Sequence, residues 1–139
     1  MPSQQGAARA IAGALRDGGL NPEDVGYINA HGTGTIANDR TECAAISQVF
    51  QDHADRLMIS STKAMHGHLI GGAGAVELLA CLMALDKGVI APTIGYQLAD
   101  PECDLDVVPN VARDQSINVA LSNAFAFGGQ NAVIALRNA

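Results

Sequence analysis

Short apolar runs alternate with longer helix-like segments along the 139 residues of this chain. Apolar runs of about four to eight residues that stop at a turn are typical of buried strands, and longer stretches with apolar positions at helical spacing are typical of helices. The expected strands are residues 25–30, 57–61, 117–122 and 132–136, and the expected helices are residues 6–15, 39–50 and 69–85. This order predicts an α/β fold with a mixed β-sheet covered by helices.

The 69–85 segment is apolar on nearly every side and carries one charged residue, Glu77. It is shorter than the ~20 residues of a membrane span, so we expect a fully buried helix. A buried carboxylate without a partner destabilises a fold by several kcal/mol. Lys63 is the nearest preceding cation, and we therefore predict a Lys63–Glu77 ion pair. The alternative is that Glu77 reaches solvent at an exposed edge of the helix.

Two of the expected strands end in glycine-rich turns that contain histidine. His31 follows residues 25–30, and Lys63 and His68 follow residues 57–61. Because α/β proteins place their chemistry beyond the carboxyl ends of strands, these three side chains are candidates for one site. The positive end of the following helix and the Lys63 charge disfavour an imidazolium at His68. A neutral imidazole can donate a hydrogen bond to an enolate-like oxygen, although both rings could instead only satisfy backbone groups in their turns.

A metal site is a further alternative for the same histidines. His66 and His68 have the spacing of metal ligands, and Asp39 or His31 could complete a set. Such a cluster would indicate a metal hydrolase. The positive charge of Lys63 near this pair would repel a bound cation, so we expect no metal at this site.

The composition excludes several classes of partner. The formal net charge is −6 and the arginines are scattered, so nucleic acid is not an expected partner. Three cysteines without close spacing are typical of reduced thiols in a cytoplasmic protein. Residues 1–6 have neither the basic nor the apolar run of a signal peptide, and no segment is expected to enter a membrane.

Three motifs together resemble a known family. They are residues 29–35 (NAHGTGT), 63–68 (KAMHGH) and 122–131 (SNAFAFGGQN), and their order and spacing are specific. Over essentially its whole length the chain resembles the C-terminal half of β-ketoacyl-ACP synthases, the elongating condensing enzymes of fatty-acid and polyketide synthesis. The resemblance implies one thiolase-like domain over residues 1–139, with one buried apolar helix.

The resemblance also implies roles for individual residues. His31 and His68 would be the catalytic histidines that assist decarboxylation of malonyl-ACP and stabilise the resulting carbanion or enolate. Lys63 would act with them as the electrostatic lysine, with Glu77 as its buried partner. Phe127 would be the gatekeeper of the acyl pocket, and Phe125, its neighbour, would lie in the same mobile turn. Phe125 is thus part of the expected gate together with Phe127. The resemblance implies no cofactor.

The nucleophile of the family is missing from this chain. The family's acylated cysteine lies in the N-terminal half, in a small-residue elbow at the start of a buried helix. Cys43 is inside a helix, Cys81 is deep in the apolar helix where thiols are usually inert, and Cys103 is in an acidic loop that would raise its pKa. None of them fits the role.

The expected function is therefore that of a C-terminal portion of a 3-oxoacyl-ACP synthase, an acyltransferase, which is inactive in condensation when alone. The implied partners are an acyl carrier protein that brings acyl and malonyl thioesters, and an N-terminal ketosynthase half or another chain. We expect the apolar face around residues 69–85 to be covered by that partner or by self-association, which makes the protein oligomeric. The alternative is a non-catalytic partner subunit of a heterodimeric ketosynthase.

Overall fold

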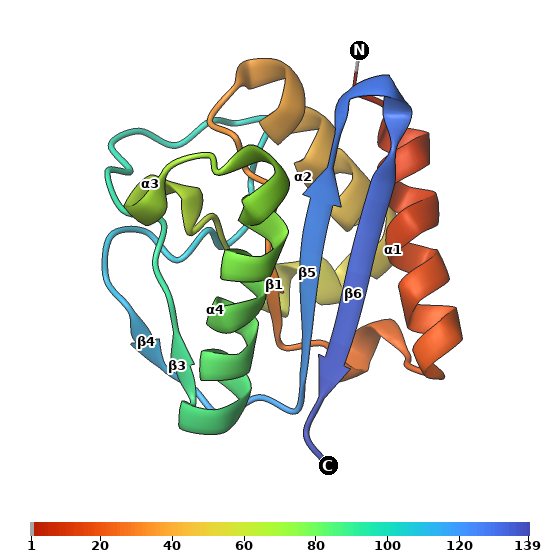
Figure 1. Ribbon diagram of the computed structural model, residues 1–139, viewed down its shortest axis with the longest axis vertical. Coiled ribbons are helices and arrows are strands. Elements are labelled where there is room, and N and C mark those ends of the chain that lie inside the picture. Colours follow the sequence, from red (N-terminus) through yellow and green to blue (C-terminus); the bar gives the residue numbers. More distant parts are fainter. Residues whose placement is uncertain (1) are drawn as a thin grey trace.

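A four-stranded sheet forms the centre of the computed structural model, which describes residues 2–139 (Figure 1). Its strand order is β2 (Met58–Ser60), β1 (Tyr27–Asn29), β5 (Val119–Phe125) and β6 (Asn131–Arg137). The first three strands are parallel and β6 runs antiparallel to β5. The prediction of a mixed sheet is confirmed, and the strands begin and end within a few residues of their expected bounds.

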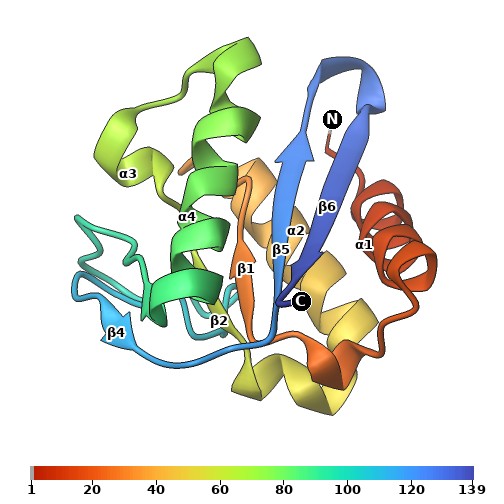
Figure 2. The same cartoon turned by 60° about the horizontal axis from the view of Figure 1, so that its bottom comes forward.

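Two helices, α1 (Gln4–Gly18) and α2 (Ile36–Phe50), cover one face of this sheet (Figure 2). Both begin at a hydroxyl cap, since the side chains of Ser3 and Thr35 each accept a backbone N–H of the first turn. The Thr35 cap places the start of α2 three residues before the expected position. The core on this side is mainly aliphatic and includes Ile11, Leu15, Ile28, Ile46, Phe50, Val119 and Leu121.

The helix α4 (Ala73–Lys87) lies on the opposite face of the sheet (Figures 1 and 2). Its inner face packs with residues of β1, β5 and the short strand β3 (Val89–Ile90); this second core includes Tyr27, Cys81, Ala84, Ile90 and Ala120. The helix begins four residues later than predicted. Ile70 has a φ of +50°, which is outside the α-helical region, and a short 3₁₀ turn over Ile70–Gly72 precedes α4.

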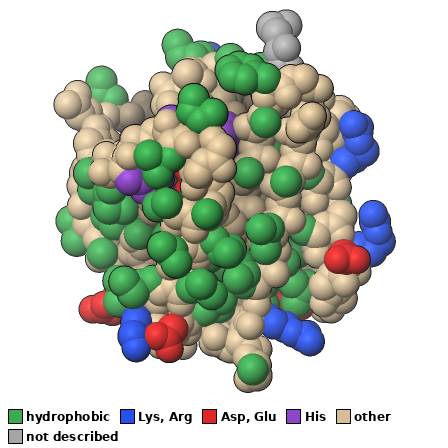
Figure 3. Space-filling model, viewed as in Figure 1, with side chains coloured by type: hydrophobic (Ala, Val, Ile, Leu, Met, Phe, Trp, Pro, Cys, Tyr) green, Lys and Arg blue, Asp and Glu red, His purple; other side chains and the backbone are tan. Residues whose placement is uncertain are grey.

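The prediction that this helix is fully buried is wrong for this chain. One face, containing Ala73, Glu77, Cys81 and Ala84, is buried against the sheet. The opposite face is exposed and apolar, and Ile134 of β6 is exposed as well; the exposed helical side chains are Val76, Leu79, Leu82 and Met83. Figure 3 shows apolar side chains spread across this side of the molecule. A single sheet can cover only one side of a helix that is apolar all round.

The remaining elements are short. The helix α3 (Lys63–His66) follows β2, and β3 pairs with β4 (Arg113–Asp114) in a separate two-stranded sheet. Most of the chain between these two strands is irregular, as its polar and proline-containing sequence predicted. Among residues 2–139 no helix combines the length and apolar character needed to cross a membrane.

Candidate active site

His31 and His68 lie next to each other beyond the carboxyl ends of β1 and β2. The two strands are parallel neighbours, so the loops that follow them emerge at the same edge of the sheet. The centroids of the two imidazole rings are 5.7 Å apart and the ring planes meet at 85°, edge to face. The structure thus brings together two side chains that are 37 residues apart in the sequence.

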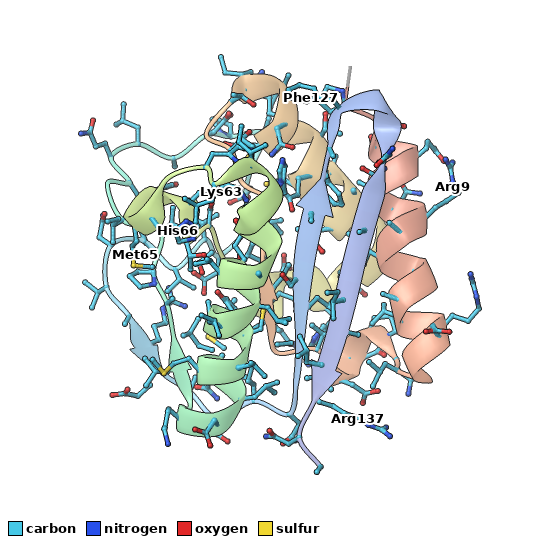
Figure 4. The ribbon with its side chains drawn as sticks, viewed as in Figure 1. Arg9, Lys63, Met65, His66, Phe127 and Arg137 are labelled. Atoms are coloured by element: carbon cyan, nitrogen blue, oxygen red, sulfur yellow. The ribbon has the colours of Figure 1, made fainter. Side chains whose placement is uncertain are left out.

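Lys63 forms the predicted ion pair with Glu77. Its Nζ contacts Oε1 of Glu77, and the two side chains are only 6% and 1% exposed. This burial excludes the alternative in which Glu77 reaches solvent. The pair ties α3 to α4, and Figure 4 shows Lys63 at the side of α3 that adjoins α4. The structure therefore fixes an ammonium charge beneath the loop that carries His68.

His31 is half-buried and is held in its neutral form. The pKa of the ring is lowered from 6.5 to about 4, chiefly by burial and to a smaller extent by the positive charge of Lys63 and the neighbouring ring of His68. At neutral pH the ring therefore has one N–H to donate and no charge of its own. Such a group can stabilise a developing oxyanion without attracting an anion in the ground state.

The backbone beside His68 selects the tautomer of its ring. The N–H of Ile70 donates to Nδ1 of His68 at 3.1 Å, so the proton of a neutral ring resides on Nε2. Ile70 itself has a left-handed φ of +50°, a conformation that destabilises a β-branched residue by about 1–3 kcal/mol. His68 was expected directly before a helix start. The 3₁₀ turn separates it from α4, so the backbone N–H rather than the helix end is its nearest polar partner.

Glu42 is a site residue that the sequence interpretation missed. Its buried carboxylate accepts the backbone N–H groups of His31 and Gly32, both at 2.9 Å, and the side-chain amide of Asn123 at 3.0 Å. Burial raises the pKa of Glu42, and these hydrogen bonds, with one from Asn38, oppose that rise. The carboxylate therefore clamps the His31 turn. Glu42 shares the inner face of α2 with Ala45, Ile46 and Phe50, and a glutamate at that helical spacing was the signal that could have revealed it.

The two phenylalanines occupy different environments. Phe125 is the last residue of β5, and its ring centroid lies 5.8 Å from that of His31. Phe127 lies in the hairpin turn and is fully exposed, as Figure 4 shows at the tip of the β5–β6 hairpin. Both were expected in one mobile turn. The strand extends further than predicted because Phe125 pairs with Asn131 across the hairpin.

The three thiols are not activated. Burial raises the pKa of Cys81 to about 12, and its Sγ donates to the carbonyl of Leu121 at 3.4 Å. Burial also leads the rise in the pKa of Cys43 and of Cys103. For Cys103 the predicted direction is correct, but its acidic neighbour Asp100 contributes less than burial does. A thiol nucleophile with a lowered pKa is thus absent from residues 2–139.

The geometry does not support the alternative of a metal site at His66 and His68. Within the described part of the chain, no three His, Cys, Asp or Glu side chains converge as ligands. Both ring nitrogens of His66 are engaged in hydrogen bonds, with the Gly67 carbonyl at 2.7 Å and the Thr62 hydroxyl at 3.2 Å. His66 and His68 therefore do not present a joint pair of nitrogen ligands.

The fold is that of thiolase-like ketosynthases, the class of the solved structures that resemble the chain. Residues 1–97 match the family described as "Beta-ketoacyl synthase, C-terminal domain". The chain therefore belongs to the β-ketoacyl synthase C-terminal domain family.

Similar proteins include Nodulation protein E of Rhizobium sp. (strain N33), which is 57% identical over 136 residues, 98% of this chain and 34% of the relative. The 3-oxoacyl-[acyl-carrier-protein] synthase 2 of Synechocystis sp. is 53% identical over 99% of this chain and 33% of its own length. The solved ishigamide ketosynthase/chain length factor is 43% identical with a TM-score of 0.95, over 99% of this chain and 34% of that one. The chain thus spans about a third of the length of these relatives.

Proposed function

We propose that this chain supplies the histidine half of a decarboxylating condensation site in a 3-oxoacyl-ACP synthase. In this proposal the thioester oxygen of a malonyl group lies between His31 and His68. Loss of carbon dioxide leaves an enolate, and N–H groups of the two neutral rings donate to its oxygen. The observation that carries the proposal is the edge-to-face contact of the two rings, 5.7 Å between centroids, with one ring neutral by burial.

The surrounding charges support this assignment. An enolate oxygen is stabilised most by donors that are already oriented before the charge develops. Ile70 orients His68 through its Nδ1, and Glu42 holds the turn of His31. The ammonium of Lys63, fixed by Glu77, keeps the nearby potential positive, which favours the developing anion over an imidazolium.

The covalent half of the reaction belongs to another segment in this proposal. No thiol in residues 2–139 is activated, so the acyl group is carried by a cysteine of the N-terminal ketosynthase half or of another chain. The apolar outer face of α4 offers the surface against which that segment packs. The chain alone is then inactive in condensation. The joint presence of His31, Lys63 and His68 favours this role over that of a non-catalytic partner subunit.

The substrates are proposed to arrive as thioesters on an acyl carrier protein. A structural neighbour is a ketosynthase in complex with its type II polyketide acyl-carrier protein, 38% identical to this chain with a TM-score of 0.95. Phe127, exposed on a hairpin turn with two positive-φ glycines, is suited to gate the acyl pocket, with Phe125 beside His31. The free thiols suit a cytoplasmic location.

A chimeric enzyme tests the proposed function. This chain replaces the matching third of the Synechocystis synthase, which then provides the remaining segment. We expect malonyl-ACP decarboxylation and condensation to be retained. His31→Ala and His68→Ala are each expected to lower decarboxylation at least ~100-fold, in the range of lost oxyanion donors. His53→Gln is the matched control, because this half-buried ring contacts the carbonyl of Val25, before the start of β1 and at the other end of that strand from His31. Full decarboxylation by the His31→Ala, His68→Ala double variant would overturn the proposal.

A further inference from the structure

His66 makes two hydrogen bonds that involve neither the Lys63–Glu77 ion pair nor the rings of His31 and His68. Its Nδ1 lies 2.7 Å from the carbonyl oxygen of Gly67, and its Nε2 lies 3.2 Å from the hydroxyl of Thr62. The ring is half-buried on α3, the helix that begins with Lys63, as Figure 4 shows. Both ends of the ring therefore hold groups of the same loop region.

The chemistry of the partners fixes the direction of each hydrogen bond. The Gly67 carbonyl can only accept, so Nδ1 of a neutral His66 carries the proton and Nε2 carries the lone pair. The Thr62 hydroxyl must then donate to Nε2. The same hydroxyl accepts from Nδ2 of Asn29 at 3.1 Å, which can only donate. The result is one directed chain from Asn29 through Thr62 and His66 to the Gly67 carbonyl.

This series of hydrogen bonds joins the three segments from which the site is built. Asn29 is the last residue of β1, two positions before His31, and its side chain is fully buried. Thr62, also buried, directly precedes Lys63. The Gly67 carbonyl belongs to the peptide that leads into His68, at a residue with a φ of +76°. The imidazole of His66 thus links Thr62, which contacts the end of β1 through Asn29, to the peptide that leads into His68.

We propose that His66 is the positioning residue of His68. By holding the Gly67 carbonyl with Nδ1–H and the Thr62 hydroxyl with Nε2, it sets the peptide plane from which the His68 ring extends. It thereby keeps Nδ1 of His68 aligned with the N–H of Ile70. The inference rests on the proposed function in one respect: only that function makes the position of His68 important for catalysis. The placement itself is a property of the folded chain.

Side-chain ¹⁵N NMR of the 139-residue chain tests the proposal, because it reports the tautomer of His68 without any assay of activity. In the unaltered chain we expect a well-separated pair of His68 nitrogen shifts with the proton on Nε2. In His66→Leu the separation is expected to fall by roughly half or more, as the second tautomer becomes populated. His66→Gln, whose side-chain oxygen can still accept from Thr62, is expected to restore part of the separation. Met65→Leu, at the exposed neighbour on α3, is the matched control.

A second variant keeps the test decisive if His66→Leu fails to fold. Thr62→Val removes the hydroxyl link and is expected to shift the His66 nitrogens, whereas Thr62→Ser preserves them. Unchanged His68 shifts in His66→Leu, or equal effects of His66→Leu and Met65→Leu, would overturn the proposal. The chimeric enzyme reports the proposed function separately. Activity that survives loss of both His31 and His68 would refute that function and leave the NMR result standing.

Discussion

The charge state of His31 is decided by its surroundings and not by its residue type. An imidazole in water titrates near 6.5, yet burial, the charge of Lys63 and the neighbouring His68 ring lower the pKa of this one to about 4. Glu42 acts on the same turn from the other side, because its carboxylate accepts two consecutive backbone N–H groups. A residue that reads as a titratable base in the sequence is therefore a neutral hydrogen-bond donor in the fold.

The lowered pKa predicts a pH dependence of stability. His31 protonates first in the unfolded chain, so unfolding takes up a proton between about pH 6.5 and pH 4, and stability falls as the pH falls through that window. The full shift corresponds to at most ~3.4 kcal/mol, and solvent screening at this half-buried ring reduces the expected loss to roughly 1–2 kcal/mol.

Two measurements check this dependence. An NMR titration of the His31 ring is expected to show a protonation midpoint near pH 4. Urea unfolding at several pH values is expected to show the loss of stability in the unaltered chain and a smaller loss in His31→Gln. A His31 ring that titrates near 6.5 would contradict the assigned neutral state.

At the scale of elements, the site depends on how α3 and α4 are joined. The Lys63–Glu77 pair is buried between them, whereas the Lys87–Asp86 pair at the end of α4 has side chains 64% and 71% exposed. Water screens the exposed pair and cannot replace either partner of the buried one. The buried pair is thus what holds the loop of His68 against the helix.

These two ion pairs should respond differently to loss of the lysine. Lys63→Met leaves a carboxylate buried without a cation, so we expect it to lower the free energy of unfolding by about 3–5 kcal/mol. Lys87→Met is the matched control and should change it by less than ~1 kcal/mol. Adding Glu77→Gln to Lys63→Met removes the unpaired charge and should recover part of the loss. Urea denaturation measures all three, and equal effects of the two lysine substitutions would contradict the role assigned to burial.

At the scale of the whole molecule, the chain has an apolar face that its own sheet does not cover. Leu79 and Met83 on the outer side of α4 and Ile134 on β6 are exposed there. The chain also spans only about a third of its relatives. An apolar surface of this kind favours association, because each large side chain that is buried contributes about 1.5–3 kcal/mol.

We therefore expect the 139-residue chain to self-associate when it is alone. Replacing Leu79 and Met83 by Gln should raise the dissociation constant by about tenfold or more, since ~1.4 kcal/mol corresponds to one factor of ten. Val111→Gln, at an exposed apolar residue in the irregular region before β4, is the matched control. Analytical ultracentrifugation over a concentration series measures the effect. A chain that stays monomeric at high concentration would show that the exposed apolar face of α4 and β6 does not drive self-association.

The sequence by itself determined the four strands of the main sheet, the three long helices and the Lys63–Glu77 pair, and it made the two histidine turns candidates for one site. These follow from local signals: apolar periodicity, glycine turns and one charge in an apolar helix whose burial demands a counter-charge. Parallel neighbouring strands then bring their carboxyl ends together. The order of the motifs also pointed to the family to which the chain belongs.

Only the tertiary structure decided how these parts act on one another. The clamp of Glu42 on the His31 turn joins α2, β1 and β5, and no local pattern reports such a contact. The neutral state of His31 depends on burial by distant residues. The exposure of one face of α4 depends on what the sheet can cover. The separation of Phe125 from Phe127 depends on strand pairing. Each is set by the packing of segments far apart in the chain, which local sequence does not encode.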